Sequence, residues 1–292
     1  MGGFYGVNGK KLQRQYKDHL SDFNQWNQKP HAKQWLIFPQ NISSRLSIDE
    51  TALSKGELYT IITNKKAKGK KGSIVGIFSG TKVEPIIEQL LKIPTSKRGQ
   101  VKEITLDMAN AMKTISTKCF PKAIQVTDRF HVQKLATQAL QDLRIKYRWE
   151  ALDQENQQIK LSRAADKEFK PVTFSNGDSS KQLLARSRYL LYKSPDKWTP
   201  NQKERAQILF NEYPELKKAY GLVQGLRNIF NQAIAIKVAY TKLAHWYKDV
   251  EESGFKSFQT VANSIALNYG SISKVGSKLK NNFLCVLNSI DE

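Results

Sequence analysis

Short segments in which apolar residues recur at strand-like spacing dominate residues 44–78. The three segments are Leu46–Ile48, Leu58–Ile62 and Ile74–Phe78. The turn-like stretch "SKGE" separates the first two, and the lysine-rich "NKKAKGKKG" separates the second from the third. Apolar runs of this length, bounded by Gly, Ser and Asn, are typical of β-strands. We therefore predict three strands joined as a meander.

The next 50 residues alternate between helical and strand-like patterns. In chain order, these patterns predict a helix at "TKVEPIIEQLLKIP", a strand at "VKEITLD", a helix at "MANAMKTISTKCF" and a strand at "KAIQVTD". Three strands followed by helix, strand, helix and strand indicate an α/β fold, with a mixed sheet flanked by helices. This is the element order of a ribonuclease-H-like core.

Beyond Asp128 the apolar residues recur at helical spacing. The segment "WTPNQKERAQILF" starts a helix, because Thr199 suits the N-cap, Pro200 the first turn and Gln202 a capping box. The polar residues 1–43 show no sustained period. We expect an N-terminal arm at 1–43, a core at 44–134, a large helical insertion at 135–270 and a divergent tail at 271–292.

The composition adds a strong positive charge. The chain has 292 residues, a formal net charge of +21 and 40% hydrophobic residues, with Cys119 and Cys285 as its two cysteines. These values predict a folded protein whose field attracts polyanions such as nucleic acid. Neither a disulfide scaffold nor a zinc module is expected, and no apolar run resembles an export signal or a membrane span. A reducing cytoplasm is the expected location.

Three aspartates follow predicted strands: Asp49 after "RLSI", Asp107 after "VKEITL" and Asp128 after "KAIQVT". The carboxyl ends of strands are where open α/β sheets gather their chemistry. If the first and fourth strands are neighbours, the carboxylates of Asp49 and Asp107 meet, and Mg²⁺ or Mn²⁺ would neutralise them and support phosphodiester chemistry. The alternative for Asp107 and Asp128 is helix N-capping, and for Asp49 it is a solvated turn.

Other residues have two readings each. His131 lies three residues after Asp128, where it would orient a phosphate or tune a metal ligand, or simply pack. The lysine loop is either a solvated hairpin tip or a phosphate contact. "RIKYRWE" and "SRYLLYKSPDKW" interleave cations with aromatics, as nucleic-acid surfaces do and as packed helices also do. The candidate DNA contacts are Lys65, Lys66, Lys68, Lys70, Lys71, Arg129, Arg144, Lys146 and Arg148.

Two long stretches carry a family resemblance. "LSIDETALSKGELYTIITNKKAKGKKGSIVGIFSGTK" and "ITLDMANAMKTISTKCFPKAIQVTDRFHVQKLATQALQDLRIKYRWEALDQEN" resemble the catalytic region of ISL3-family insertion-sequence transposases, especially those of Bacteroidetes. The likeness continues through "KQLLARSRYLLYKSPDKWTPNQKERAQILF" to about Tyr269. It covers most of the chain and is too long to be a chance motif match.

The resemblance implies a ribonuclease-H-like DDE transposase with a helical insertion after the fifth strand. It makes Asp49 and Asp107 the first two catalytic, metal-binding acids, and it makes Glu50 a supporting acid. Asp128 and His131 match the family's Asp-x-x-His element. The implied partners are transposon-end and target DNA, further copies of the chain assembled on DNA, and a separate DNA-binding subunit. The implied location is the bacterial cytoplasm, in association with the nucleoid.

One departure from the family concerns the third acid. The family has a glutamate in a helix that follows the counterpart of "VANSIALNYGSI", whereas this chain continues as "SKVGSKLKNNFLCVLNSIDE". Glu251 and Glu252 lie upstream of the expected position, and Glu292 has no matching context. We therefore expect a C-terminal truncation that weakens the metal site. The alternative function is a non-catalytic, DNA-binding transposase remnant.

Overall fold

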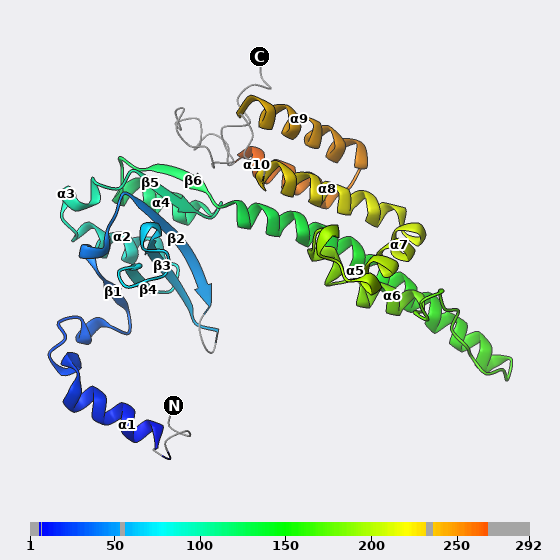
Figure 1. Ribbon diagram of the computed structural model, residues 1–292, viewed down its shortest axis with the longest axis horizontal. Coiled ribbons are helices and arrows are strands. Elements are labelled where there is room, and N and C mark those ends of the chain that lie inside the picture. Colours follow the sequence, from blue (N-terminus) through cyan, green and yellow to red (C-terminus); the bar gives the residue numbers. More distant parts are fainter. Residues whose placement is uncertain (1–5, 7, 53–55, 232–235, 268–292) are drawn as a thin grey trace. The chain divides into compact units, whose positions relative to one another are not determined.

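The structure is a computed structural model that describes residues 6, 8–52, 56–231 and 236–267 of the chain. The chain divides into two compact units, Met1–Gln125 and Val126–Glu292. Figure 1 labels their elements. The division lies before residue 134, where the sequence pattern placed the end of the core.

Five strands of the first unit, together with β6 at its boundary, form a six-stranded mixed sheet with the strand order β1-β4-β3-β2-β5-β6. Its strands are β1 (Trp35–Ile37), β2 (Arg45–Ala52), β3 (Leu58–Asn64), β4 (Ile74–Ser79), β5 (Glu103–Leu106) and β6 (Ile124–Thr127). Strands β2, β3 and β4 pair antiparallel in chain order, and β1 pairs antiparallel with β4. Strand β5 pairs parallel with β2. The predicted meander and mixed sheet are confirmed.

Helices α2 (Val83–Leu91) and α4 (Asn110–Cys119) cover one face of this sheet (Figure 1). Alternate residues of the central strands point to this face, since side chains of a strand alternate between its two sides. The helices contribute Ile86, Leu90, Met112 and Ile115 to the core, and the sheet contributes Leu46, Ile48, Ile62, Val75, Phe78, Ile104 and Leu106. The short helix α3 (Thr95–Arg98) leads into β5.

Strand β1 lies within residues 1–43, which were expected to form an N-terminal arm with at most one short helix. It has three residues, so its sequence carries too little alternation to predict a strand. Contacts from the preceding turn hold it: the Gln28 side chain accepts a hydrogen bond from the Ile37 amide at 2.7 Å, and the His31 ring stacks on Trp35. Helix α1 (Gly9–Gln15) precedes these turns.

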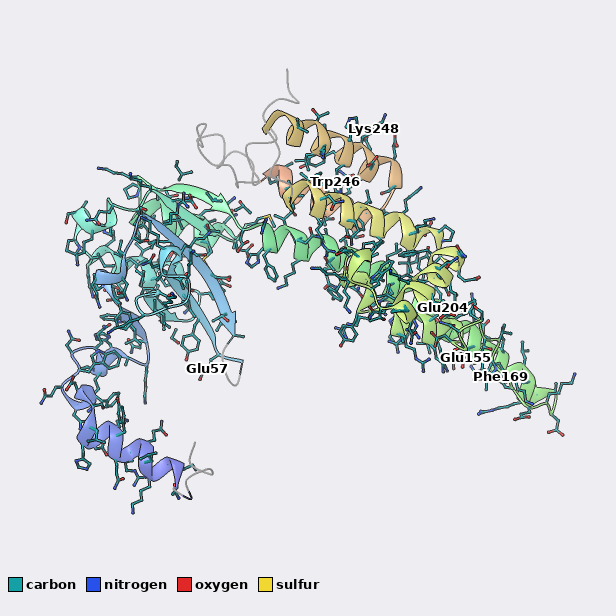
Figure 2. The ribbon with its side chains drawn as sticks, in the orientation of Figure 1. Glu57, Glu155, Phe169, Glu204, Trp246 and Lys248 are labelled. Carbon is teal, nitrogen blue, oxygen red and sulfur yellow. The ribbon has the colours of Figure 1, made fainter. Side chains whose placement is uncertain are left out.

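The second unit is helical, as the periodicity beyond Asp128 predicts. Its helices are α5 (Arg129–Ala164), α6 (Ser180–Arg186), α7 (Pro200–Glu212), α8 (Pro214–Asn231), α9 (Ile236–Ser253) and α10 (Lys256–Leu267). Helix α5 packs against α6, α8 and α10. The Trp246 indole of α9 donates a hydrogen bond to the carbonyl of Leu222 on α8 and is buried between these helices (Figure 2).

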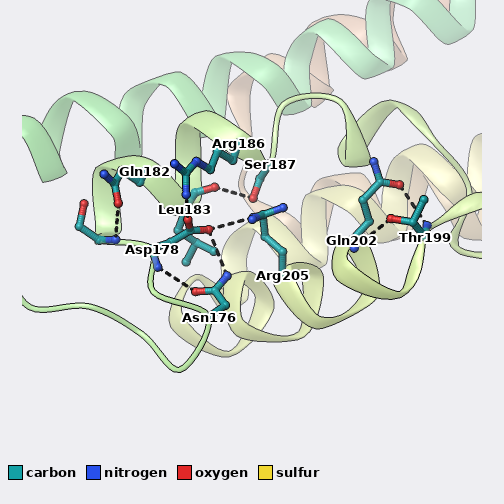
Figure 3. Close-up of polar contacts among 10 residues, drawn as sticks. Asn176, Asp178, Gln182, Leu183, Arg186, Ser187, Thr199, Gln202 and Arg205 are labelled. Carbon is teal, nitrogen blue, oxygen red and sulfur yellow. Dashed lines mark hydrogen bonds and ion pairs between the residues drawn. The ribbon is translucent and has the colours of Figure 1, made fainter.

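Local sequence rules explain how α6 and α7 begin. Thr199 and Gln202 form the predicted capping box of α7, and Ser179 and Gln182 form another at α6. The fully buried Asp178 carboxylate, just before α6, pairs with Arg186 of α6 and Arg205 of α7 (Figure 3). This one carboxylate therefore ties the loop before α6 to both helices.

No helix among the residues that the structure describes is both long and apolar enough to span a bilayer.

Candidate functional site

Asp49 of β2 and Asp107, which directly follows β5, come immediately after paired residues of two neighbouring parallel strands. The register pairs Ile48 of β2 with Leu106 of β5, and the two aspartates are the next residues along each strand. Adjacent strands in a sheet are about 4.8 Å apart. The first and fourth predicted strands are neighbours, so the two acids come together at the ends of β2 and β5.

The Asp49 and Asp107 side chains each accept a hydrogen bond from the next backbone amide, that of Glu50 and that of Met108. Asp107 is not the N-cap of α4, because that helix begins at Asn110 with Ala109 at the cap position. The N-cap alternative for Asp107 is therefore wrong. Asp49 lies inside the eight-residue strand β2, so it is not a turn residue either.

A polar ladder runs along the sheet below the two acids. Two residues before the acids along the chain, Ser47 pairs with Thr105. Two residues earlier again, Arg45 pairs with Glu103. Arg45 Nε lies 3.5 Å from Glu103 Oε2. Because residues two apart on a strand share a face, these pairs and the acids occupy one face, opposite the core residues Ile48 and Leu106.

The lysine loop between β3 and β4 contributes to this ladder. Lys65 Nζ donates a hydrogen bond to Thr105 Oγ1 at 2.7 Å, so its ammonium lies two residues before Asp107 along the sheet. The side chain of Asn64 accepts from the Lys66 amide and shapes the start of the loop. All five lysines of the loop are exposed: Lys65, Lys66, Lys68, Lys70 and Lys71.

Glu50 does not join the acid pair. It is level with Thr60 on β3, and its side chain alternates to the opposite side of β2 from that of Asp49. Strand alternation therefore puts the Glu50 carboxylate on the other side of β2, and its supporting role stays a prediction. The backbone amide of Glu50, which donates to Asp49, is the part of this residue that the site uses.

Asp128 and His131 lie at the start of α5, in the second unit. The Asp128 carboxylate accepts a hydrogen bond from the Phe130 amide at 2.9 Å and is the N-cap of α5, which confirms the capping alternative. The His131 amide donates to the Asp128 carbonyl, and the His131 ring meets the exposed Phe130 ring edge-on. The Asp-x-x-His spacing thus builds a helix start.

The four basic candidates on α5 differ in exposure. Arg129 is exposed and donates to the Phe230 carbonyl, Lys146 is exposed and 3.9 Å from Glu150, and Arg148 is exposed. Arg144 is different: it is 5% exposed, and its guanidinium donates to Gln141 Oε1 and to the Leu184 carbonyl. A DNA phosphate needs an exposed donor, so the buried Arg144 guanidinium does not fit a DNA contact.

The acid pair suits one hard cation when other oxygen ligands complete the shell. Mg²⁺ is commonly held by one or two carboxylates together with water and substrate phosphate oxygens. Within the described ranges, no cluster of three or more His, Cys, Asp or Glu side chains forms a ready metal cage. The donor set therefore fits a metal that binds together with a phosphate-bearing substrate.

The polar ladder was not predicted, although the sequence carries a signal for it. Arg45, Ser47 and Asp49 alternate with Leu46 and Ile48, and Glu103 and Thr105 occupy the same alternate positions in "VKEITLD". Polar residues at every second position of a strand indicate a polar face. The contact from Lys65 to Thr105 joins residues that are 40 apart in sequence, so no local sequence pattern predicts it.

Comparisons with known proteins show that the chain is similar to transposases. A family model described as "Transposase", of the ISL3 type of DDE transposases, matches residues 46–288. The chain is 25% identical over 200 residues to the transposase for insertion sequence element IS1557 of Mycobacterium tuberculosis, which covers 64% of this chain and 41% of the relative. It is 24% identical over 224 residues to the transposase for insertion sequence element IS1001 of Bordetella parapertussis, which covers 75% of this chain and 48% of the relative.

The chain spans less than half the length of these curated relatives. The family match runs on to residue 288, beyond about 270, where the resemblance was expected to end. It covers the β2–β5 acid pair, the lysine loop and the helices from α5 to α10. The chain belongs to the ISL3 family of transposases.

Proposed function

We propose that this chain supplies the catalytic region of a DDE transposase, with a ribonuclease-H-like core that cuts and joins DNA strands. The observation that carries the proposal is the β2–β5 register, in which Ile48 pairs with Leu106 and the next residues are Asp49 and Asp107. Two carboxylates level on adjacent strands are the arrangement that divalent-metal phosphodiester chemistry uses.

Each part of the polar face has a role in this proposal. The carboxylates of Asp49 and Asp107 would hold Mg²⁺ or Mn²⁺, which when bound activates the attacking hydroxyl and stabilises the leaving oxygen. The backbone amides of Glu50 and Met108 orient the two carboxylates before substrate arrives. The exposed lysines between β3 and β4 attract the DNA backbone, in keeping with the net charge of +21.

A cleavage assay tests the proposal directly. A labelled duplex that contains the transposon end should be cut by the full chain with Mg²⁺ or Mn²⁺, and Asp107→Asn should lower the rate about 1,000-fold, because it removes several kcal/mol of transition-state stabilisation. Asp22→Asn, at an exposed residue of the N-terminal segment, is the matched control and should leave the rate unchanged. Equal rates for the Asp107 variant and the control would refute the assignment.

Metal binding gives an independent readout. Asp49→Asn should keep the circular dichroism spectrum and lower the Mg²⁺ affinity measured by titration calorimetry, since one of two ligands becomes neutral. Unchanged affinity in this variant would count against a metal at the acid pair.

The second candidate function is binding of transposon DNA without cleavage. It is favoured because the register joins two acids, and no third acid clusters with others in the part of the chain that the structure describes. Under this alternative, DNA binding falls with rising salt, yet no cleavage product forms with any divalent cation. The two functions therefore predict opposite outcomes in the same assay.

A further inference from the structure

Two segments that interleave cations with aromatic residues, "RIKYRWE" and "SRYLLYKSPDKW", lie near each other in the second unit. The Gln141 side chain of α5 donates a hydrogen bond to the Arg188 carbonyl, and Arg144 of α5 donates to the Leu184 carbonyl. Helix α5 also packs against the turn Leu190–Tyr192, and Arg188 and Tyr192 act electrostatically on Arg144. "RIKYRWE" and "SRYLLYKSPDKW" therefore lie close together, although about 40 residues separate them in sequence.

These two segments carry exposed cations and exposed aromatic rings. Tyr189 is 67% exposed, Tyr192 is 42% exposed, and the Arg188 guanidinium lies 5.5 Å from the centre of the Tyr189 ring. Arg148 follows Arg144 by one helical turn and is exposed on the same helix. We call Arg148, Arg188, Tyr189 and Tyr192 the arginine–tyrosine cluster.

The cluster concentrates positive charge around a buried guanidinium. Burial lowers the pKa of Arg144, and the positive charges of Arg148 and then Arg188 lower it further. Arg144 thus lies within electrostatic reach of both exposed arginines. A site where like charges gather around a desolvated cation is stabilised when an anion binds, because the anion relieves their mutual repulsion.

The exposed rings favour bases that are not already stacked. In duplex DNA each base is covered by its neighbours, whereas an unpaired base presents a free face on which Tyr and Arg stack. We propose that the arginine–tyrosine cluster binds unpaired nucleotides of transposon DNA, with Tyr189 and Tyr192 against the bases and Arg148 and Arg188 against the phosphates. This inference rests on the proposed function for the identity of DNA as substrate.

The proposed role of the cluster is tested by measuring how labelled DNA binds the full chain, with fluorescence anisotropy as the readout and EDTA in the buffer. The probes are a single strand of about 12 nucleotides, within the site sizes typical of such surfaces, and a duplex of the same sequence. Tyr189→Ala should weaken single-strand binding about 10-fold, which corresponds to one lost stacking contact, and change duplex binding less than about 2-fold. Tyr189→Phe keeps the ring and should bind like the unchanged chain.

Arg188→Gln should weaken binding of the single strand and lower its salt dependence by about one released counterion. Arg163→Gln is the matched control on α5, 15 residues from Arg148 and so about 22 Å along the helix. Tyr16→Ala is the aromatic control, because this ring is 59% exposed in the N-terminal segment. Neither control should alter single-strand binding.

Two results would overturn the inference: single-strand affinity that survives Tyr189→Ala, or an equal loss in the Tyr16→Ala control. The circular dichroism melting curve of each variant shows whether it is folded. Because EDTA removes divalent metal, this assay is independent of strand cleavage. A cluster that binds single strands in a chain that never cuts DNA would refute the proposed catalysis and leave the inference standing.

Discussion

Lys65 Nζ donates a 2.7 Å hydrogen bond to Thr105 Oγ1, which fastens one lysine of the β3–β4 loop to the strand that ends before Asp107. Thr105 precedes Asp107 by two residues, about 7 Å along an extended chain, so the contact from Lys65 is made close to the acid pair. This lysine is held in place, whereas a solvated lysine pays rotamer entropy whenever it contacts a ligand.

We expect Lys65 to act at the reacting phosphate and its loop neighbours to act on the DNA backbone generally. Lys65→Gln should lower the single-turnover cleavage rate about 10-fold or more, because one charged contact in a partly desolvated site is worth at least about 1.4 kcal/mol. Lys66→Gln removes the same charge one residue away and should weaken DNA binding slightly without that loss of rate. Equal effects of the two variants on cleavage would show that Lys65 has no special position.

Residues of the acid pair were predictable because the information is local. Each aspartate ends an apolar run, and the order of strands and helices places those runs side by side. The ladder below them was not predicted, because its meaning depends on which strand pairs with which. Strand β1 was missed for a related reason, since three residues cannot show a period.

The structure also distinguishes candidate site residues that have the same sequence context. Asp128 and Asp107 both precede helices, yet Asp128 caps α5 while α4 begins too late for Asp107 to cap it. Arg144 and Arg148 both lie in "RIKYRWE", one helical turn apart on the same face, yet Arg144 is buried against α6 and Arg148 is exposed. Composition and spacing do not encode which residues of a helix its partner covers. Tertiary packing decides it.

Asp178 should control the stability of the helical unit (Figure 3). Burial by itself would raise the pKa of this carboxylate, but hydrogen bonds from Arg205 and Arg186 outweigh burial and hold the pKa below its ordinary value of 3.8. Asp178→Asn leaves both arginines without their counter-charge and should lower the free energy of unfolding by about 3 kcal/mol near neutral pH. Urea denaturation measures this difference.

The pH dependence of that difference has a defined sign. A carboxylate with a depressed folded-state pKa contributes fully above its unfolded pKa, and the contribution is lost as pH falls through the folded value. The gap between Asp178→Asn and the unchanged chain should therefore be widest above about pH 5 and close progressively below 3.8. Glu168→Gln, at an exposed pair with Lys170, is the control and should show no gap. A gap that stays constant down to pH 2 would mean that Asp178 acts by packing alone.

Cys119 should be inert in the folded protein. Its side chain is buried in the core under the sheet, and burial raises the pKa of the thiol to about 11. The reactive thiolate is then about one part in a thousand at pH 8. In a Cys285→Ser background, iodoacetamide should label the chain slowly in buffer and rapidly in urea, as mass spectrometry would show. Rapid labelling of the folded chain would contradict the burial of α4 against the sheet.

Arg144 and Arg148 should have opposite phenotypes although they lie one helical turn apart. The Arg144 guanidinium donates to Gln141 and to the Leu184 carbonyl, so Arg144→Ala leaves buried acceptors unsatisfied and should cost about 2 kcal/mol of unfolding free energy. Arg148→Ala removes an exposed cation and should leave stability nearly unchanged while weakening DNA binding. Urea denaturation measures the stability of both variants, and fluorescence anisotropy measures their DNA binding. If Arg144→Ala proved as stable as the unchanged chain yet bound DNA poorly, Arg144 would be a DNA contact after all, and the packing of α5 against α6 would need to open when DNA binds.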